Sequence, residues 1–189
     1  DKIHITNGSK VEFVEDPDGT VYEIAKPINE PDGINPYDPD IAGTDSYDEV
    51  VPEDTGSMGA TMVYRCFSGL SNDYNMPVAL VYERGDASSD DTFYSNSLKV
   101  CVRYRCKTLV EYSKILIINY FEDCLAQQYL TLKPILRNEA IANKGRQTYG
   151  VHMKGEMKGI VTRLLKHEVN QNSQNIWLDL IILDLIEYG

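Results

Sequence analysis

The chain has 189 residues, of which 42% are hydrophobic and 25% are charged, and its formal net charge is −11. These proportions are typical of a globular domain with a hydrophobic core, and they exclude collagen-like, coiled-coil and wholly disordered chains. The acidic balance argues against direct contact with nucleic acid over the whole surface, because phosphates would be repelled.

The acidic excess is concentrated in the first sixty residues. Residues 1–60 contain 15 acidic and 3 basic side chains, whereas residues 61–189 contain 14 acidic and 15 basic ones, so their net charges are −12 and +1. Within the first part, residues 27–59 contain five prolines and no basic residue. Because proline removes backbone donors and like charges repel, we expect an extended acidic arm or linker over 27–59.

The residues on either side of this arm are predicted to form β-strands. Residues 1–26 indicate a β-meander, since Asn7-Gly8 is a favoured hairpin turn and residues 20–26 alternate in polarity after a second turn at 16–19. After the arm, two apolar runs at 61–67 and 76–84 predict two more strands, separated by a polar loop.

The second half of the chain gives one clear strand pattern and several ambiguous ones. Residues 98–108 alternate between apolar and mostly basic side chains, which predicts a strand. Thr108 and Glu111 fit a capping box, so one long buried helix is predicted at about 109–129. Residues 151–169 favour a strand, although their apolar residues also fit helical spacing: Met157, Ile160, Val161, Leu164 and Leu165. The Ile- and Leu-rich residues 176–188 fit a strand or a helix, and a strand is favoured.

Together these elements predict an α+β fold. Its sheet is expected to be predominantly antiparallel, with one long buried helix and the extended acidic Pro/Gly-rich arm. Residues 60–189 form the main body, which is expected to make one compact domain with residues 1–26.

Basic side chains line one face of the strand predicted at 98–108. They are Lys99, Arg103, Arg105 and Lys107. Such a row is usually a solvated face, but here it can also receive an acidic partner, in particular the arm of the same or a neighbouring chain. The acidic residues proposed to meet it are Asp38, Asp40, Asp45, Asp48 and Glu49.

The arm also matches part of a twelve-residue calcium loop. The candidate ligands are Asp38, Asp40, Ser46 and Glu49, with Gly43 at the sixth position. Ala42 stands where a fifth-position ligand is expected, so a solvated acidic loop is the preferred interpretation. No metal or other cofactor is predicted.

The sequence contains no complete catalytic constellation. Glu156 and Lys158 match half of a metal-dependent nuclease site, but no aspartate lies between Asp123 and Asp179 to complete it. The four cysteines form no Cys-x-x-Cys pair, and on the predicted strand Cys101 and Cys106 would point to opposite faces. We therefore expect reduced cysteines, which favours synthesis in the cytoplasm. A bridge from Cys66 to a strand cysteine stays open.

These observations predict a non-enzymatic structural or assembly subunit of a larger oligomer, tethered to its neighbours by the acidic arm. The expected partners are other protein subunits, in a homo- or hetero-oligomer, without a membrane. A virus particle, a phage head–tail apparatus or a secretion machine would suit such a subunit. The alternatives are a metal-dependent hydrolase or nuclease around Glu156 and Lys158, and a monomeric ligand-binding module.

Overall fold

The computed structural model describes residues 10–28, 40–46, 58–67, 74–84, 90–132, 148–153 and 155–176. The strands are β1 (Val21–Glu23), β2 (Asp40–Asp45), β3 (Met58–Arg65), β4 (Met76–Arg84) and β5 (Thr108–Val110). The α-helices are α1 (Asp90–Tyr104), α2 (Ile115–Asp123) and α3 (Glu156–Asn172), with short 3-10 turns η2 (Gln127–Tyr129) and η3 (Ser173–Asn175).

The five strands form one sheet in the order β1-β4-β3-β2-β5. All neighbours are antiparallel except β2 and β5, which are parallel. This confirms the predicted α+β class with a mostly antiparallel sheet. The strands predicted at 61–67 and 76–84 are also confirmed, as β3 and β4.

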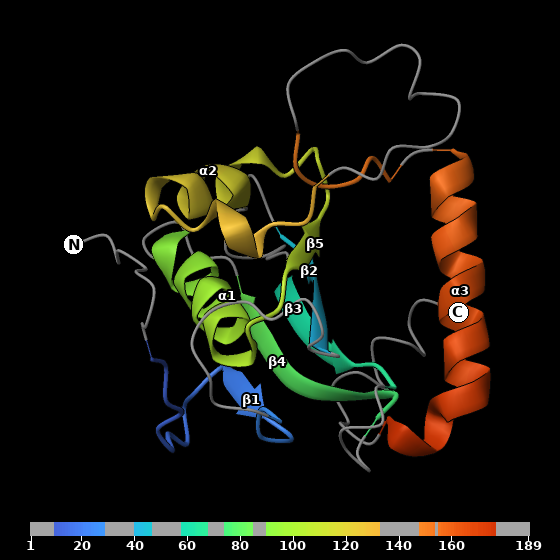
Figure 1. Ribbon diagram of the computed structural model, residues 1–189, viewed down its shortest axis with the longest axis horizontal. Coiled ribbons are helices and arrows are strands. Elements are labelled where there is room, and N and C mark those ends of the chain that lie inside the picture. Colours follow the sequence, from blue (N-terminus) through green and yellow to red (C-terminus); the bar gives the residue numbers. More distant parts are fainter. Residues whose placement is uncertain are drawn as a thin grey trace.

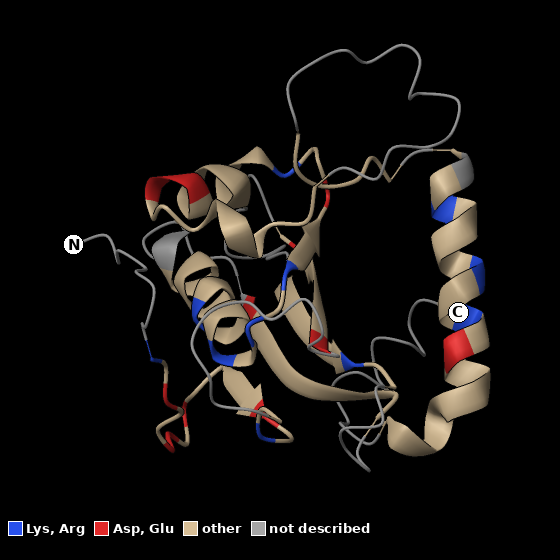
Figure 2. Ribbon diagram, in the orientation of Figure 1, with Lys and Arg blue, Asp and Glu red and all other residues tan. Residues whose placement is uncertain are grey.

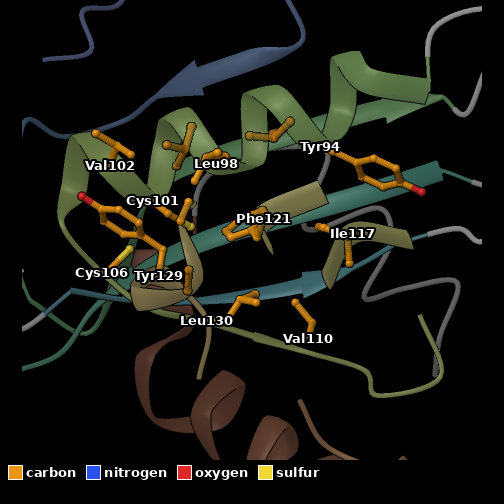
Figure 3. Close-up of a cluster of buried hydrophobic side chains, with 14 of the residues drawn as sticks. Tyr94, Leu98, Cys101, Val102, Cys106, Val110, Ile117, Phe121, Tyr129 and Leu130 are labelled. Atoms are coloured by element: carbon orange, nitrogen blue, oxygen red, sulfur yellow. The ribbon is translucent and has the colours of Figure 1, made fainter. Parts of the chain in front are cut away.

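The two faces of the sheet have different surroundings. Helices α1 and α2 lie on one face, and α3 stands on the other side of the sheet (Figure 1). The buried core forms between the sheet and the first two helices, where Leu98 from α1 and Phe121 from α2 lie with Val110 of β5 (Figure 3). Within the described residues, no helix is long and apolar enough to cross a membrane.

The strand predicted at 98–108 is wrong, because most of these residues belong to helix α1. In the latter part of this helix only Asn96, Lys99 and Arg103 are partly exposed, at helical spacings of three and four. A helix buried on nearly all sides carries apolar residues at both odd and even positions, and this produces the alternation of a strand by coincidence.

The single long helix predicted at about 109–129 is also wrong. Thr108 begins β5 rather than capping a helix, and the helical part is the nine-residue α2 followed by η2. Both helices end where a residue other than glycine adopts a positive φ, Arg105 (50°) after α1 and Leu125 (55°) after α2. Each residue turns the chain sharply, so the apolar run folds back into short elements.

The N-terminal and arm predictions need correction in part. β1 is the strand found within residues 10–28, residues 10–20 form none, and residues 1–9 lie outside the described residues. In the predicted arm, Asp40–Asp45 is the strand β2, paired with β3 on one side and β5 on the other. The arm prediction is therefore wrong for these residues, and 29–39 and 47–57 lie outside the described residues.

The strand favoured at 151–169 is a helix over most of its length. α3 spans seventeen residues, and its apolar residues follow the helical spacing that the sequence also offered. The run at 176–188 lies outside the described residues beyond Ile176.

Candidate functional site

The open face of the sheet, opposite α1 and α2, carries exposed apolar side chains. On β2, Asp40, Ala42 and Thr44 are buried, so the alternating residues Ile41 and Gly43 point away from α1. Ile41 is 54% exposed, and Leu109 on the adjacent β5 is 37% exposed. A Cβ atom built on Gly43 would meet no atom of the described residues within 4 Å, so none of them covers this position.

Helix α3 carries a second exposed apolar surface, which we call the α3 ridge. Val161, Leu164 and Leu165 are 37%, 62% and 38% exposed. Their spacing of three and four residues places them on one side of the helix. Three neighbouring large apolar side chains form a continuous patch, whereas single exposed ones are common on any protein.

One contact between α3 and the sheet fixes the direction in which the ridge points. The Tyr64 hydroxyl of β3 donates a hydrogen bond to the Glu168 carboxylate of α3. At 3.6 residues per turn, all three ridge residues lie within about 60° of Glu168 around the helix axis. Tyr64 pairs with Ile41 in the sheet and shares its face. The ridge therefore points toward the open face of the sheet, beside which α3 lies (Figure 1).

Polar contacts hold the C-terminal end of α3 in place. The Asn172 side chain donates to Glu168 at 2.6 Å, and the Asn175 side chain donates to the Asn75 carbonyl at 3.0 Å. Burial, followed by the hydrogen bond to Glu168, raises the pKa of Tyr64, which keeps the hydroxyl protonated as the donor. Burial and the nearby carboxylates of Asp40 and Glu168 raise the pKa of the Cys66 thiol, so this thiol is a weak nucleophile.

Two groups of buried polar side chains on the covered face of the sheet are hydrogen-bonded internally. The Arg65 guanidinium donates to both carboxylate oxygens of Asp40, at 2.8 and 3.0 Å, and to the Lys26 carbonyl. Four hydroxyls form a chain nearby, from Ser97 through Thr61 and Thr44 to Thr108, with oxygen separations of 2.7–2.8 Å. Satisfied buried networks of this kind hold strands in register, so we assign them a structural role.

The structure does not bring the four predicted basic residues into one row. Lys99 and Arg103 lie on the partly exposed side of α1, Arg105 is buried at the turn after it, and Lys107 is exposed before β5. Figure 2 shows the Lys and Arg residues spread over several elements. The strand that would have aligned these residues in one row is therefore wrong, while their role in binding a partner stays a prediction.

Arg103 does bind the acidic first third of the chain, but through β1. Its guanidinium forms an ion pair with Glu23 at 3.2 Å and donates to the Val11 carbonyl. Of the acidic residues proposed as its partners, Asp38, Asp48 and Glu49 lie outside the described residues. Asp40 is paired with Arg65 instead. Loss of solvent raises the pKa of Asp45, an effect opposed by the charge of Lys114 and reinforced by Glu111.

The calcium-loop interpretation does not fit the described part of the match. Asp40 and Gly43 lie in a strand that is paired on both sides, which is not the curled conformation of a calcium loop. Both Asp40 oxygens are taken by Arg65, and the buried Ser46 hydroxyl has no hydrogen-bond partner among the described residues. The other two candidate ligands, Asp38 and Glu49, lie outside the described residues.

Glu156 and Lys158 lie in the first turn of α3 and not on a strand. The strand placement behind the nuclease alternative is therefore wrong. A search of the described residues finds no group of three or more His, Cys, Asp or Glu side chains placed to hold a metal ion. His152 is exposed and contacts Tyr112, with ring centroids 4.3 Å apart and ring planes tilted by 55°, and His167 is exposed on α3.

The sequence contained a signal for the α3 ridge, namely the helical spacing of its apolar residues. The strand interpretation outweighed it because Gly155 and Gly159 disfavour a helix. Gly155 in fact precedes the helix with φ of 54°, and Gly159 sits where an added Cβ would meet no atom within 4 Å. The open sheet face had no comparable signal, because β2 was read as part of the arm.

Comparisons with known proteins give no family for this chain: no family model, no curated protein and no solved structure matches it.

Proposed function

We propose that this protein is a non-enzymatic assembly subunit that associates with a second copy of itself through the α3 ridge and the open sheet face. The observation that carries the proposal is the exposure of Leu164 and its neighbours on the side of α3 that points toward the open sheet face, where Ile41 and Leu109 are also exposed. Contiguous exposed apolar patches on soluble proteins mark interaction sites.

Burial of the ridge provides the driving force for this association. Covering a leucine side chain fully contributes about 1.5–3 kcal/mol, and Leu164 is 62% exposed, so its burial contributes about 1–2 kcal/mol. In a two-fold symmetric dimer each side chain is buried twice, which doubles the gain. The contributions of the other apolar side chains are smaller because more of their surface is already covered in the single chain. The exposed fractions are 54% for Ile41, 38% for Leu165 and 37% for Val161.

Two of the cations of α3, Arg163 and Lys166, do not oppose such pairing. Arg163 and Lys166 lie more than about 130° from Glu168 around the helix axis, on the side away from the ridge. A second copy that packs against the ridge and the open sheet face therefore leaves these cations in solvent. An assembly subunit of this kind suits a virus particle, a phage head–tail apparatus or a secretion machine, which is the setting we propose for it.

Sedimentation velocity over a range of concentrations tests this proposal with a matched pair of variants. Leu164→Gln and Lys166→Gln introduce the same side chain on opposite sides of α3, and glutamine is well tolerated in helices. We expect Leu164→Gln to weaken association at least about tenfold, which corresponds to about 1.4 kcal/mol. Lys166→Gln should leave it unchanged.

Two outcomes of this experiment count against the proposal. The wild-type chain could sediment as a monomer at every concentration, or the two variants could weaken association equally. Circular dichroism of both variants controls for loss of helix content.

A further inference from the structure

The end of helix α1 brings two cysteines together. The Cys106 amide donates to the Cys101 carbonyl at 3.1 Å, and the Arg105 amide donates to the Val102 carbonyl at 3.3 Å. Arg105 adopts a left-handed conformation with φ of 50°. These two hydrogen bonds and the positive φ define a Schellman motif, in which the residues at the positions of Cys101 and Cys106 normally make an apolar contact.

The backbone hydrogen bond limits the distance between the two residues to one compatible with a disulfide. With a 3.1 Å hydrogen bond between Cys101 O and Cys106 N, covalent geometry keeps the two Cα atoms no more than about 7 Å apart. Disulfides join Cα atoms about 4.4–6.8 Å apart. Both side chains are buried in the same hydrophobic core cluster. Figure 3 shows both at the end of α1, beside Tyr129.

We propose that Cys101 and Cys106 are an oxidisable pair, which forms an intrachain disulfide across the end of α1. The sequence interpretation excluded this bridge because a strand would point the two side chains to opposite faces. The helix and its left-handed end remove that objection. Of the other two cysteines, Cys66 follows β3, and Cys124 follows α2 and is buried in the same core cluster as the pair.

Oxidised glutathione is a sufficient oxidant for forming the disulfide between the two cysteines. A thiolate of the pair attacks one sulfur of oxidised glutathione and releases one glutathione thiolate. The second cysteine, as its thiolate, then attacks the mixed disulfide and releases the other glutathione. The protein loses two electrons and two protons, which reduce one glutathione disulfide to two glutathione thiols.

Burial determines when this bridge forms. Cys101 is 0% and Cys106 2% exposed, and the hydrogen bond with Cys101 together with burial raises the pKa of the Cys106 thiol well above its usual value. Both effects slow attack on an oxidant in the folded chain. The bridge therefore forms mainly while the chain folds in an oxidising buffer, and once formed it is shielded from reductants.

Refolding the wild-type chain in a glutathione redox buffer, followed by tryptic mapping, tests this proposal. Trypsin cuts after Arg103 and Arg105, between the two cysteines, and releases residues 100–103 and 106–107 as separate peptides. We expect these two peptides to be joined, with a mass two hydrogens lower than their sum. We also expect Cys66 and Cys124 to stay reactive toward a thiol reagent in the unfolded oxidised chain.

The variant Cys66→Ala/Cys124→Ala serves as the control, because it keeps only the proposed pair. The same linked peptide should form in this variant, and added dithiothreitol should separate it. The proposal is overturned if Cys101 and Cys106 remain free or glutathionylated under conditions that oxidise a reference dithiol. It is also overturned if either bridges to Cys66 or Cys124 in the wild-type chain.

Discussion

Arg65 and Asp40 form an ion pair in the interior of the sheet, with side chains only 2% and 4% exposed. Both carboxylate oxygens accept from the guanidinium, and the Lys26 carbonyl accepts from it as well. Removing one partner of such a pair leaves the other charge buried without compensation. The pair therefore explains why an aspartate can begin a central strand.

We predict that Asp40→Asn lowers the free energy of unfolding by about 3–5 kcal/mol, as is typical when a buried ion pair is broken. Glu23→Gln is the matched control, because the Glu23–Arg103 pair has the same chemistry but is more exposed, at 19% and 16%. Its cost should be about 1 kcal/mol or less. Urea unfolding followed by circular dichroism measures both, and equal costs would contradict the structural role assigned to Asp40.

This pair also explains what the sequence could not reveal about β2. The inward-facing residues of β2 are Asp40, Ala42 and Thr44, so two of three are polar, and the strand looks like a solvated loop. The groups that satisfy them, Arg65, Thr61 and Thr108, come from distant parts of the chain. Local composition cannot show such partners, whereas β3 and β4 were predictable from their own apolar runs.

At the scale of whole elements, both α1 and α2 end in the same way. After α2 the Ala126 amide donates to the Phe121 carbonyl at 2.8 Å, and the Leu125 amide donates to the Glu122 carbonyl at 3.0 Å. This repeats the Schellman motif seen after α1. Leu125 holds the left-handed position, with φ of 55°, and its side chain is 64% exposed.

We predict that Leu125→Gly stabilises the protein by about 0.5–1 kcal/mol. The left-handed conformation destabilises a residue with a Cβ atom by about 1–2 kcal/mol. Glycine avoids this strain but loses more backbone entropy on folding, so the net stabilisation is smaller. Leu116→Gly, within the same helix, should instead destabilise by about 1 kcal/mol. Thermal unfolding of the two variants tests the assignment, and destabilisation by both would contradict it.

These helix ends also show why the helices were hard to predict. The left-handed positions are occupied by Arg105 and Leu125. Glycine is the usual residue at such a position, and its presence in the sequence would have indicated the end of each helix. Without that signal, α1 was read as a strand, and the residues after it were read as one long helix. The apolar residues of the α3 ridge, in contrast, follow regular helical spacing, so this part of the candidate site can be predicted from the sequence.

At the scale of the whole molecule, the structure shows how the acidic first sixty residues are attached to the nearly neutral remainder of the chain. Asp40–Arg65 and Glu23–Arg103 each join an acidic residue of the first sixty to an arginine of the remaining chain. The acidic first third is therefore attached to the nearly neutral body by ion pairs within one chain. Charge alone does not call for a neighbouring subunit, and the case for assembly depends on the apolar surfaces.

Hydrogen exchange measured at several protein concentrations tests the assembly surface most directly, because it locates the surface on the chain. If copies meet through the α3 ridge, the amides of Val161–Val169 should exchange more slowly as concentration rises, since covering the helix suppresses its local opening. The buried amides of α1 should exchange at the same rate throughout. Concentration-independent exchange in α3, or slowing confined to α2, would contradict the proposed surface.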